Sequence, residues 1–468
     1  MKKIDIDFFE YESEKYENSL DNVFKKVNGV FYTDSELARA IVKFLRLPKD
    51  ASYIDPCCGT GSFLYELSKL GIKKIYGCDF DLSAVEICRE LTCLDKIYKI
   101  DTLGRTGQEI LSDIKVDKFD YVIGNPPYAP IAKDVNIKCD ESFMSLVRES
   151  GSNLFVAAIY RAFELAKDDG IISFIVPKNL LHVSSYQRLR KVLLKEKSII
   201  SIIELGIHFK AVRGEQVVIT FKNKYSENNN INFYKYNNGK IKFMSSAPQD
   251  YYENEIIVFT SNKERYIYDK LRTSYDGLEK VCSKAIHRGR NKNSEALKGK
   301  QIRKYGFKEK EIPKTGTQLF IQNIFAAEAG ITACFGGSLI PSETITVVNL
   351  ESIEIAKYIL GLLSSRVCNY YLIRFLFNNS RLTIHTDAKY LNKIPIVLDE
   401  KKKNIVVELV EAIEKTKYMS KEWFLLNEQI NNVVYEIYNI KSKDKKYIES
   451  EMRKISSAKW YEDYYNWE

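Results

Sequence analysis

The 468-residue sequence has few of the features that mark a secreted, metal-binding or membrane protein. Its nine cysteines show no Cys-x-x-Cys spacing and its four histidines form no cluster, which argues against a zinc site and favours reduced thiols in a cytosol. No apolar run approaches the ~20 residues of a membrane span, and the N-terminus lacks the apolar stretch of a signal peptide. The composition therefore predicts a cytoplasmic protein without metal or membrane association.

Glycine and proline are also scarce, at 22 and 10 residues, while 45% of the residues are hydrophobic and 28% are charged. This is globular composition, and the length predicts two or three domains. The net charge is +9, and residues 286–314 contribute most of it, with ten Lys or Arg against three Glu. A charge run is usually a solvated face, but so strong a bias, with Tyr305 and Phe307 inside it, fits contact with a polyanion.

Strand-like and helix-like patterns alternate between residue 52 and about residue 223. The predicted strands are 52–54, 74–78, 97–100, 119–124, 170–177, 198–205 and 216–222. Helical patterns separate most of them, among them 82–93, 152–168 and 185–196. Strands separated by helices predict an α/β fold with a doubly wound, mostly parallel, Rossmann-like sheet that is covered on both faces.

Glycines and carboxylates follow the first three of these strands. The loop Asp55–Phe63 contains Gly59 and Gly61, which allow tight turning and close approach of the backbone to a ligand. Asp79 and Asp101 end the next two strands, where a carboxylate can bind ribose hydroxyls or an exocyclic amine. A single Asp at such a place is most often a helix cap. The glycine loop, Asp79 and Asp101 follow one another in strand order, and the Gly-Lys-Ser/Thr of a P-loop is absent. Together these three sites fit a nucleoside without a phosphate chain, such as S-adenosylmethionine.

The fourth strand ends at Asn125-Pro126-Pro127-Tyr128, at the sheet edge where open α/β sheets bind ligands. An Asn oxygen and a neighbouring backbone carbonyl can accept the two hydrogens of an exocyclic amine, which localises the lone pair on its nitrogen. The prolines aim the carbonyl rigidly, and Tyr128 offers a flat face to a planar base. A rigid turn after a strand is the alternative, and the tetrapeptide alone does not decide between the two.

Together these features resemble the gamma-class amino-methyltransferases, DNA adenine-N6 enzymes of restriction–modification systems. The resemblance covers roughly 25–225, through Asp55-Pro-x-Cys58-Gly59-x-Gly61-x-Phe63, Asn125-Pro-Pro-Tyr128 and an upstream Tyr32-Thr33. It implies that S-adenosylmethionine is bound by Tyr32, Thr33, Asp55, Pro56, Cys57, Gly59, Gly61, Phe63, Asp79, Phe80, Asp101 and Thr102. It implies a catalytic site made of Asn125, Pro126, Pro127, Tyr128 and Phe209.

Two positions leave questions within this resemblance. Phe209 matches the place of an aromatic that closes the far face of the target base, and a core phenylalanine is the alternative. Some relatives have an aromatic near the cofactor where this chain has Ala158, so that contact is missing at its usual place.

The rest of the chain is expected to form a separate recognition domain of α+β type. The predicted domains are a methyltransferase domain over 1–240, a DNA target-recognition domain over 250–400, and a C-terminal helical segment over 401–468. A hairpin or surface excursion is predicted over 224–250. Residues 8–28 are expected to be helical, and continuous helices are predicted from 356 to about 376 and over 401–438. The candidate DNA contacts are Arg288, Arg290, Lys292, Lys298, Lys300, Arg303 and Lys304.

The resemblance implies a prokaryotic, cytoplasmic, site-specific DNA adenine-N6 methyltransferase that acts as a monomer on a base flipped from double-stranded DNA. A separately encoded restriction endonuclease is a further partner that it allows, and too little chain precedes Gly29 for a fused one. An RNA or protein-glutamine N-methyltransferase and a catalytically silent DNA-binding specificity subunit stay open as alternatives. A cytosine-N4 enzyme usually has Ser in place of Asn125, and the only Pro-Cys pair, Pro56-Cys57, is misplaced for a cytosine-C5 enzyme.

Overall fold

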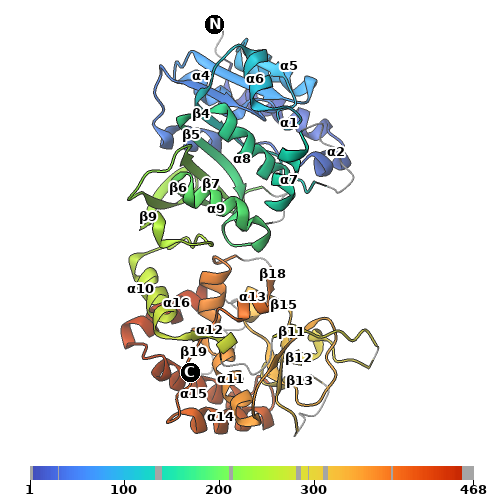
Figure 1. The fold of residues 1–468 in the computed structure, drawn as a ribbon, viewed down its shortest axis with the longest axis vertical. Helices are drawn as coiled ribbons and strands as arrows, with labels where there is room; N and C mark the ends of the chain where they lie inside the picture. The colour runs from blue at the N-terminus through green and yellow to red at the C-terminus, as the bar shows by residue number, and fades with distance from the viewer. Residues whose placement is uncertain are drawn as a thin grey trace. The chain divides into compact units, whose positions relative to one another are not determined.

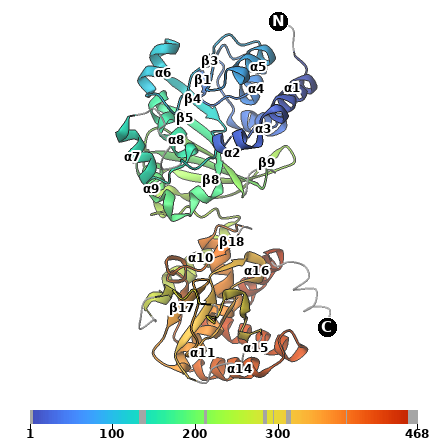
Figure 2. The same cartoon turned by 90° about the vertical axis from the view of Figure 1, so that its right-hand side faces the viewer.

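The computed structural model describes residues 4–29, 31–131, 140–209, 214–280, 286–293, 295–308, 315–380 and 383–455. The chain divides into two compact units, Met1–Asn262 and Lys263–Glu468, which Figures 1 and 2 colour from blue to yellow-green and from yellow to red. Each unit has its own sheet and its own helices. The segment over 401–468 that the sequence set apart contributes its helices to the second unit.

A nine-stranded sheet in the order β3-β2-β1-β4-β5-β7-β6-β8-β9 forms the first unit. Parallel pairing joins five of its strands: β1 (Ser52–Asp55), β2 (Lys74–Asp79), β3 (Ile97–Lys99), β4 (Phe119–Gly124) and β5 (Ala166–Pro177). The seventh strand, β7 (Gln216–Lys222), runs antiparallel to both β5 and β6 (Ser198–Gly206). The connection between β6 and β7 is too short for the crossover that parallel pairing requires.

Helices cover both faces of this sheet, which confirms the predicted doubly wound, mostly parallel α/β fold (Figure 1). One layer holds α3 (Ser35–Leu45), α4 (Ser62–Lys69) and α5 (Leu82–Thr92), and another holds α6 (Gly107–Ile114) and α8 (Leu154–Leu165). The remaining helices of the unit are α1 (Ile6–Ser19), α2 (Asn22–Asn28), α7 (Glu141–Glu149) and α9 (Gln187–Lys195). All four residues of β1 are buried, as expected for a central strand with helices on both sides.

The stretch over 224–250 forms a hairpin that extends the sheet. Strands β8 (Asn230–Asn237) and β9 (Lys240–Pro248) pair antiparallel, and β8 pairs in parallel with β6. The two residues between them, Asn238 and Gly239, have φ values of 44° and 70°. This is the Asn-Gly turn whose twist matches that of a hairpin, so the hairpin interpretation of this polar stretch is confirmed.

The second unit is a mixture of a small sheet and helices. Its antiparallel sheet has the order β11 (His287–Arg288), β17 (Ile345–Asn349), β14 (Gln318–Gln322) and β16 (Ala333–Phe335). Helix α11 (Ile353–Ser364) packs against β14, β16 and α14 (Lys403–Lys415). Figures 1 and 2 both show α14 beside α15 (Lys421–Ile437), and α16 (Ser442–Ile455) follows. The predicted α+β character with C-terminal helices is confirmed.

Three segments predicted as helical are each divided in two by a capping side chain. The segment over 401–438 is two helices, because Ser420 accepts a hydrogen bond from Trp423 N–H and begins α15. Ser365 likewise ends α11 and begins α12 (Arg366–Tyr370). Asp21 accepts from Val23 N–H and separates α2 from α1. Ser and Asp favour N-caps over helix interiors. The predictions of continuous helices were therefore wrong at Ser365 and Ser420, whereas 8–28 is helical, as predicted, on both sides of Asp21.

None of the helices within the described ranges is both long and apolar enough to cross a membrane. Seven cysteines fall in these ranges, all as free thiols and most of them buried; Cys139 and Cys282 lie outside the described residues.

A buried ion pair joins two elements of the second unit. Glu264 lies in the first turn of α10 (Asn262–Ser274), and Arg374 lies in a π-helical turn over Tyr371–Leu376. Arg374 Nη2 donates to Glu264 Oε2 at 2.5 Å, and Tyr370 donates to Oε1 at 3.3 Å. Both charged groups are fully buried, so removing one partner leaves the other charged and desolvated.

We expect Glu264→Ala to destabilise the second unit by about 3–5 kcal/mol, because Arg374 would lose its buried counter-charge. Tryptophan fluorescence in a denaturant titration reports selectively on unfolding of the second unit. All three tryptophans of the chain lie beyond residue 262: Trp423, Trp460 and Trp467. Glu279→Ala, which removes an exposed carboxylate from the same unit, is the control. Equal denaturation midpoints for Glu264→Ala and the wild type would show that the ion pair contributes little to the stability of the second unit.

Candidate functional site

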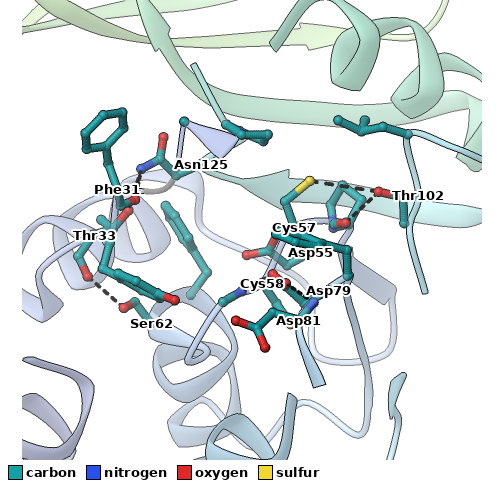
Figure 3. Close-up of a pocket in the computed structure, with 18 of the residues that line it drawn as sticks. Phe31, Thr33, Asp55, Cys57, Cys58, Ser62, Asp79, Asp81, Thr102 and Asn125 are labelled. Carbon is teal, nitrogen blue, oxygen red and sulfur yellow. Dashed lines mark hydrogen bonds between the residues drawn. The ribbon is translucent and has the colours of Figure 1, made fainter. Parts of the chain in front are cut away.

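A pocket opens in the first unit where β1, β2 and β4 end (Figure 3). It holds about 780 Å³ of empty space, including its open mouth. Ligand sites commonly measure roughly 300–1,000 Å³. Its walls come from the loops after these strands and from the segment before α3. Parallel strands end at one edge of the sheet, and for this reason loops distant in sequence meet here.

Eleven of the twelve predicted cofactor-binding residues line this pocket: Tyr32, Thr33, Asp55, Pro56, Cys57, Gly59, Phe63, Asp79, Phe80, Asp101 and Thr102. Gly61 does not line it. Gly61 precedes α4 with a φ of 95°, and a Cβ atom there would lie 2.5 Å from Cys88 Sγ. Its lack of a side chain lets α4 and α5 pack closely behind the pocket.

Sequence reasoning missed several residues of the wall. Ser62 and Asp81 adjoin predicted residues, and their proximity in sequence was a signal for them. Phe31 precedes the predicted Tyr32-Thr33 pair. Phe24 lies on α2, ahead of every motif, and nothing in the sequence indicated that it would reach the pocket.

Two buried carboxyl groups shape the electrostatics of the pocket. Asp79 accepts hydrogen bonds from Gly59 N–H at 2.8 Å and from Asp81 N–H at 3.0 Å. Asp55 accepts from Cys57 N–H at 3.0 Å. Burial raises the pKa of Asp55 to about 8 and that of Asp79 to about 6, and these backbone donors offset only part of the effect.

The described residues that line the pocket include no Lys, Arg or His. The carboxylates therefore face a space without a cationic side chain, and a ligand with hydroxyl donors or a positive charge compensates them best. A phosphate would be repelled. The lining is thus compatible with a nucleoside that has no phosphate chain, the ligand class predicted from the glycine loop.

Three groups orient the side chain of Asn125 at the end of β4. Its Nδ2 donates to the Phe31 carbonyl at 3.0 Å and to Thr33 Oγ1 at 3.2 Å, as Figure 3 shows for the first of these. The Tyr128 hydroxyl donates to Asn125 Oδ1 and has the Ile175 carbonyl, at 3.0 Å, as a second acceptor. A backbone carbonyl only accepts, so Nδ2 must face Phe31 and Oδ1 is left as the acceptor.

The predicted catalytic residues divide into two groups. Asn125 and Pro127 line the pocket, whereas Pro126, Tyr128 and Phe209 do not. The Tyr128 ring stacks on Phe31 with ring centroids 6.0 Å apart. Phe209 is buried in a hydrophobic cluster with residues of α3.

The seven predicted DNA contacts also divide by exposure. Arg288, Arg290, Lys292, Lys298 and Lys300 are exposed on the second unit. Arg303 is half-buried with its guanidinium 5.1 Å from the ring centroid of Tyr418, and Lys304 is half-buried near Arg366. Burial lowers the pKa of Lys304 to about 8. Of the same basic run, Lys310 and Lys314 lie outside the described residues.

The raised pKa of Asp79 makes the stability of the ligand-free protein depend on pH. An ordinary Asp releases its proton near pH 3.8, but folded Asp79 holds it until about pH 6. The stabilising contribution is therefore full at low pH and is lost as pH rises through 6. We expect Asp79→Asn to flatten this fall between pH 4 and 7 in denaturant titrations. The charge of Asp79 also raises the pKa of Asp55, so the variant should in addition shift the Asp55 titration to lower pH. Parallel curves between pH 4 and 7 would contradict the assignment.

The chain matches known families and proteins over its first unit. The family described as N-6 DNA Methylase matches residues 7–285. The type II methyltransferase M.VspI of Vibrio sp. (strain 343) is 31% identical over 208 residues, which cover 43% of this chain and 49% of that protein. A tRNA (guanine(10)-N2)-dimethyltransferase of Methanocaldococcus jannaschii is 32% identical over 163 residues, covering 33% and 46%. The chain spans about half the length of the curated relatives it matches.

Among solved structures, the type IIL restriction-modification enzyme MmeI in complex with DNA resembles almost the whole chain. The TM-score is 0.51 at 14% sequence identity, and the match covers 97% of this chain and 77% of that one. At this identity the likeness shows a shared fold, and it includes the second unit.

Proposed function

This chain belongs to the N-6 DNA methylase family, and we propose that it is a site-specific DNA methyltransferase of restriction–modification type that methylates N6 of adenine with S-adenosylmethionine. The observation that carries the proposal is the placement of Asn125. Its side chain is oriented by Phe31 and Thr33 in the wall of the same pocket that holds Asp55 and Asp79. An amine-binding group and a nucleoside site thus share one cavity.

The residues of the pocket fit S-adenosylmethionine. This cofactor carries a methyl group on a positively charged sulfur, from which the methyl is readily transferred. With a pKa of about 6, the buried Asp79 supplies negative charge near neutral pH without a cationic side chain beside it, and it suits ribose hydroxyls. Asp55, with a pKa of about 8, offers a second carboxyl group that a positive ligand would favour in its charged form. Asp101 Oδ1 accepts from Leu103 and Gly104 N–H, both at 3.1 Å, so its other oxygen is available for an exocyclic amine of the cofactor.

Asn125 would activate the target amine by hydrogen bonding. In the mechanism that we propose, its Oδ1 and the Pro126 carbonyl accept the two hydrogens of adenine N6 and localise the lone pair on nitrogen. The Tyr128 hydroxyl, now on Oδ1, can then move to the Ile175 carbonyl. The methylated amine is acidic enough to lose its proton to water, so no carboxylate base is required.

Adenine N6 is paired inside a duplex, so the target base must be flipped out to reach Asn125. The exposed arginines and lysines of the second unit would hold the phosphates of double-stranded DNA, and this unit would serve as the target-recognition domain. We propose that the chain acts as a monomer, with or without a separately encoded restriction endonuclease.

A second candidate is methylation of an RNA amine. It is favoured by one observation, the 32% identity to a tRNA guanine-N2 dimethyltransferase over 163 residues. Guanine N2 is also an exocyclic amine, so the matched half does not by itself separate the two nucleic acids. The second unit and its basic residues favour DNA.

Sequencing the DNA and tRNA of a methylation-free host that expresses the chain tests the proposal directly. We expect N6-methyladenine at one fixed DNA motif. Methylated tRNA with unmodified DNA would replace DNA by RNA as the substrate, and no methylation of either by a protein that binds S-adenosylmethionine would overturn both.

We expect Asn125→Ala to lower kcat by about 10²–10³-fold, the usual cost of losing an oriented group that acts in the transition state. The affinity for S-adenosylmethionine, measured by calorimetry, should stay within about twofold, because Asn125 holds the target amine. Asn237→Ala, on the exposed hairpin turn of the same unit, is the control. A variant with wild-type kcat would rule out this mechanism.

We expect Arg290→Ala and Lys300→Ala each to reduce the slope of log K against log salt concentration for DNA binding by about one, since each would remove one phosphate contact. The affinity should fall uniformly across DNA sequences. Lys280→Ala, which removes the same charge from an exposed lysine paired with Asp276, is the control. An unchanged slope would remove these residues from the interface.

A further inference from the structure

Two phenylalanines face each other at the pocket. Phe24 lies on α2 and Phe80 follows β2, and both line the cavity. Their ring centroids are 6.1 Å apart with an interplanar angle of 24°. Within the described residues neither ring has another aromatic partner, and Phe80 is 42% exposed. The pocket therefore has a nearly parallel pair of rings beside open space.

The other aromatic rings of the wall are already engaged. Phe31 stacks on Tyr128, Tyr32 meets Tyr16 edge-on, and Phe63 is buried in the core. Ala158, which stands where some relatives have an aromatic, is buried in α8 and does not line the pocket. Phe24 and Phe80 stack on each other, but both line the cavity and Phe80 is well exposed, so a flat ligand group could enter between them.

The neighbours of Phe80 indicate which part of a nucleoside would reach it. Asp79, the residue before it, suits ribose hydroxyls, and Asp101 at the next strand end suits an exocyclic amine. A base between these two carboxylates runs alongside Phe80. Carbon atoms in contact lie about 3.5–4.0 Å apart. A planar base between the rings therefore needs them about 7 Å apart, and a small outward shift of α2 supplies the difference.

A small shift of helix α2 would disrupt little core packing. It buries none of its seven residues, and Val23 and Val27 are 69% and 64% exposed. Its C-terminal end is fixed, because the Gly29 carbonyl accepts a hydrogen bond from Tyr128 N–H at 3.1 Å. A Cβ at Gly29 would lie 2.5 Å from that nitrogen, so only glycine allows the contact. The helix can pivot about an end that is bonded to the catalytic loop.

We propose that Phe24 is a cofactor-binding residue that stacks on the purine of S-adenosylmethionine opposite Phe80, so that α2 forms one wall of the purine site. This inference rests on the proposed function for the identity of the ligand. Phe24 supplies from an N-terminal helix the aromatic surface that Ala158 does not provide. The bond from Tyr128 N–H to the Gly29 carbonyl holds the C-terminal end of α2 in place while Phe24 moves.

Calorimetric titration of the full chain with S-adenosylmethionine and with S-adenosylhomocysteine tests the stacking. We expect Phe24→Ala to weaken both ligands by the same factor, about 10- to 100-fold, as expected for the loss of one stacked ring. The two ligands share the purine but differ in charge at sulfur, so an equal loss identifies the base as the stacked group. Phe24→Tyr should keep wild-type affinity, and Val23→Ala, on the exposed side of α2, is the control.

Binding of Phe24→Ala within twofold of the wild type, or a loss confined to the charged ligand, would overturn the inference. Phe24→Trp gives a readout that does not depend on that variant folding. Its fluorescence, corrected for the tryptophans of the second unit, should change with S-adenosylhomocysteine and saturate. A flat signal at saturating ligand would also overturn the inference. A wild-type chain that binds neither ligand would overturn the proposed function instead.

Discussion

The parallel pairing of β1 with β2 on one side and with β4 on the other is the constraint on which the candidate site depends. Parallel neighbours all end at the same edge, so Asp55, Asp79 and Asn125 meet around one pocket although long helices and loops separate them in sequence. Helices on both faces keep these strands buried and their ends fixed. Strand β7 runs antiparallel to its neighbours because the connection between β6 and β7 is short. It does not pair with β1, β2 or β4, so the parallel order of these three strands is unchanged.

The same edge concentrates negative charge in a poorly solvated place. Burying Asp55 and Asp79 without a cation beside them costs folding free energy, which the surrounding hydrophobic cluster offsets. Proteins tolerate such local costs mainly at functional sites. In the function that we propose, a ligand with hydroxyl donors and a positive charge would relieve this cost and gain affinity from it.

The segment from Gly29 to Thr33 connects the two halves of this site. Thr33 receives a hydrogen bond from Asn125 through its hydroxyl, and its carbonyl accepts one from Ser62 Oγ, at 2.6 Å, beside the glycine loop. Gly29 bonds to the backbone of Tyr128. Thr33 and Gly29 thus connect the glycine-loop side of the pocket to Asn125 and Tyr128. These are the two parts of the cavity to which we assign the cofactor and the target amine. Displacing the segment would disturb both.

The sequence by itself determined the order of strands and helices and the chemistry at each strand end, because hydrophobic periodicity and strand-end motifs are local properties. Eleven predicted residues line one pocket for this reason. It did not mark the helix breaks at Asp21, Ser365 and Ser420, where a cap competes with helix propensity. Only the tertiary structure decided that Phe24 reaches the pocket, that Phe209 is buried, and that Arg303 and Lys304 turn inward from a basic run. Those outcomes depend on which surfaces distant segments present to one another, and residue spacing along the chain does not encode that directly.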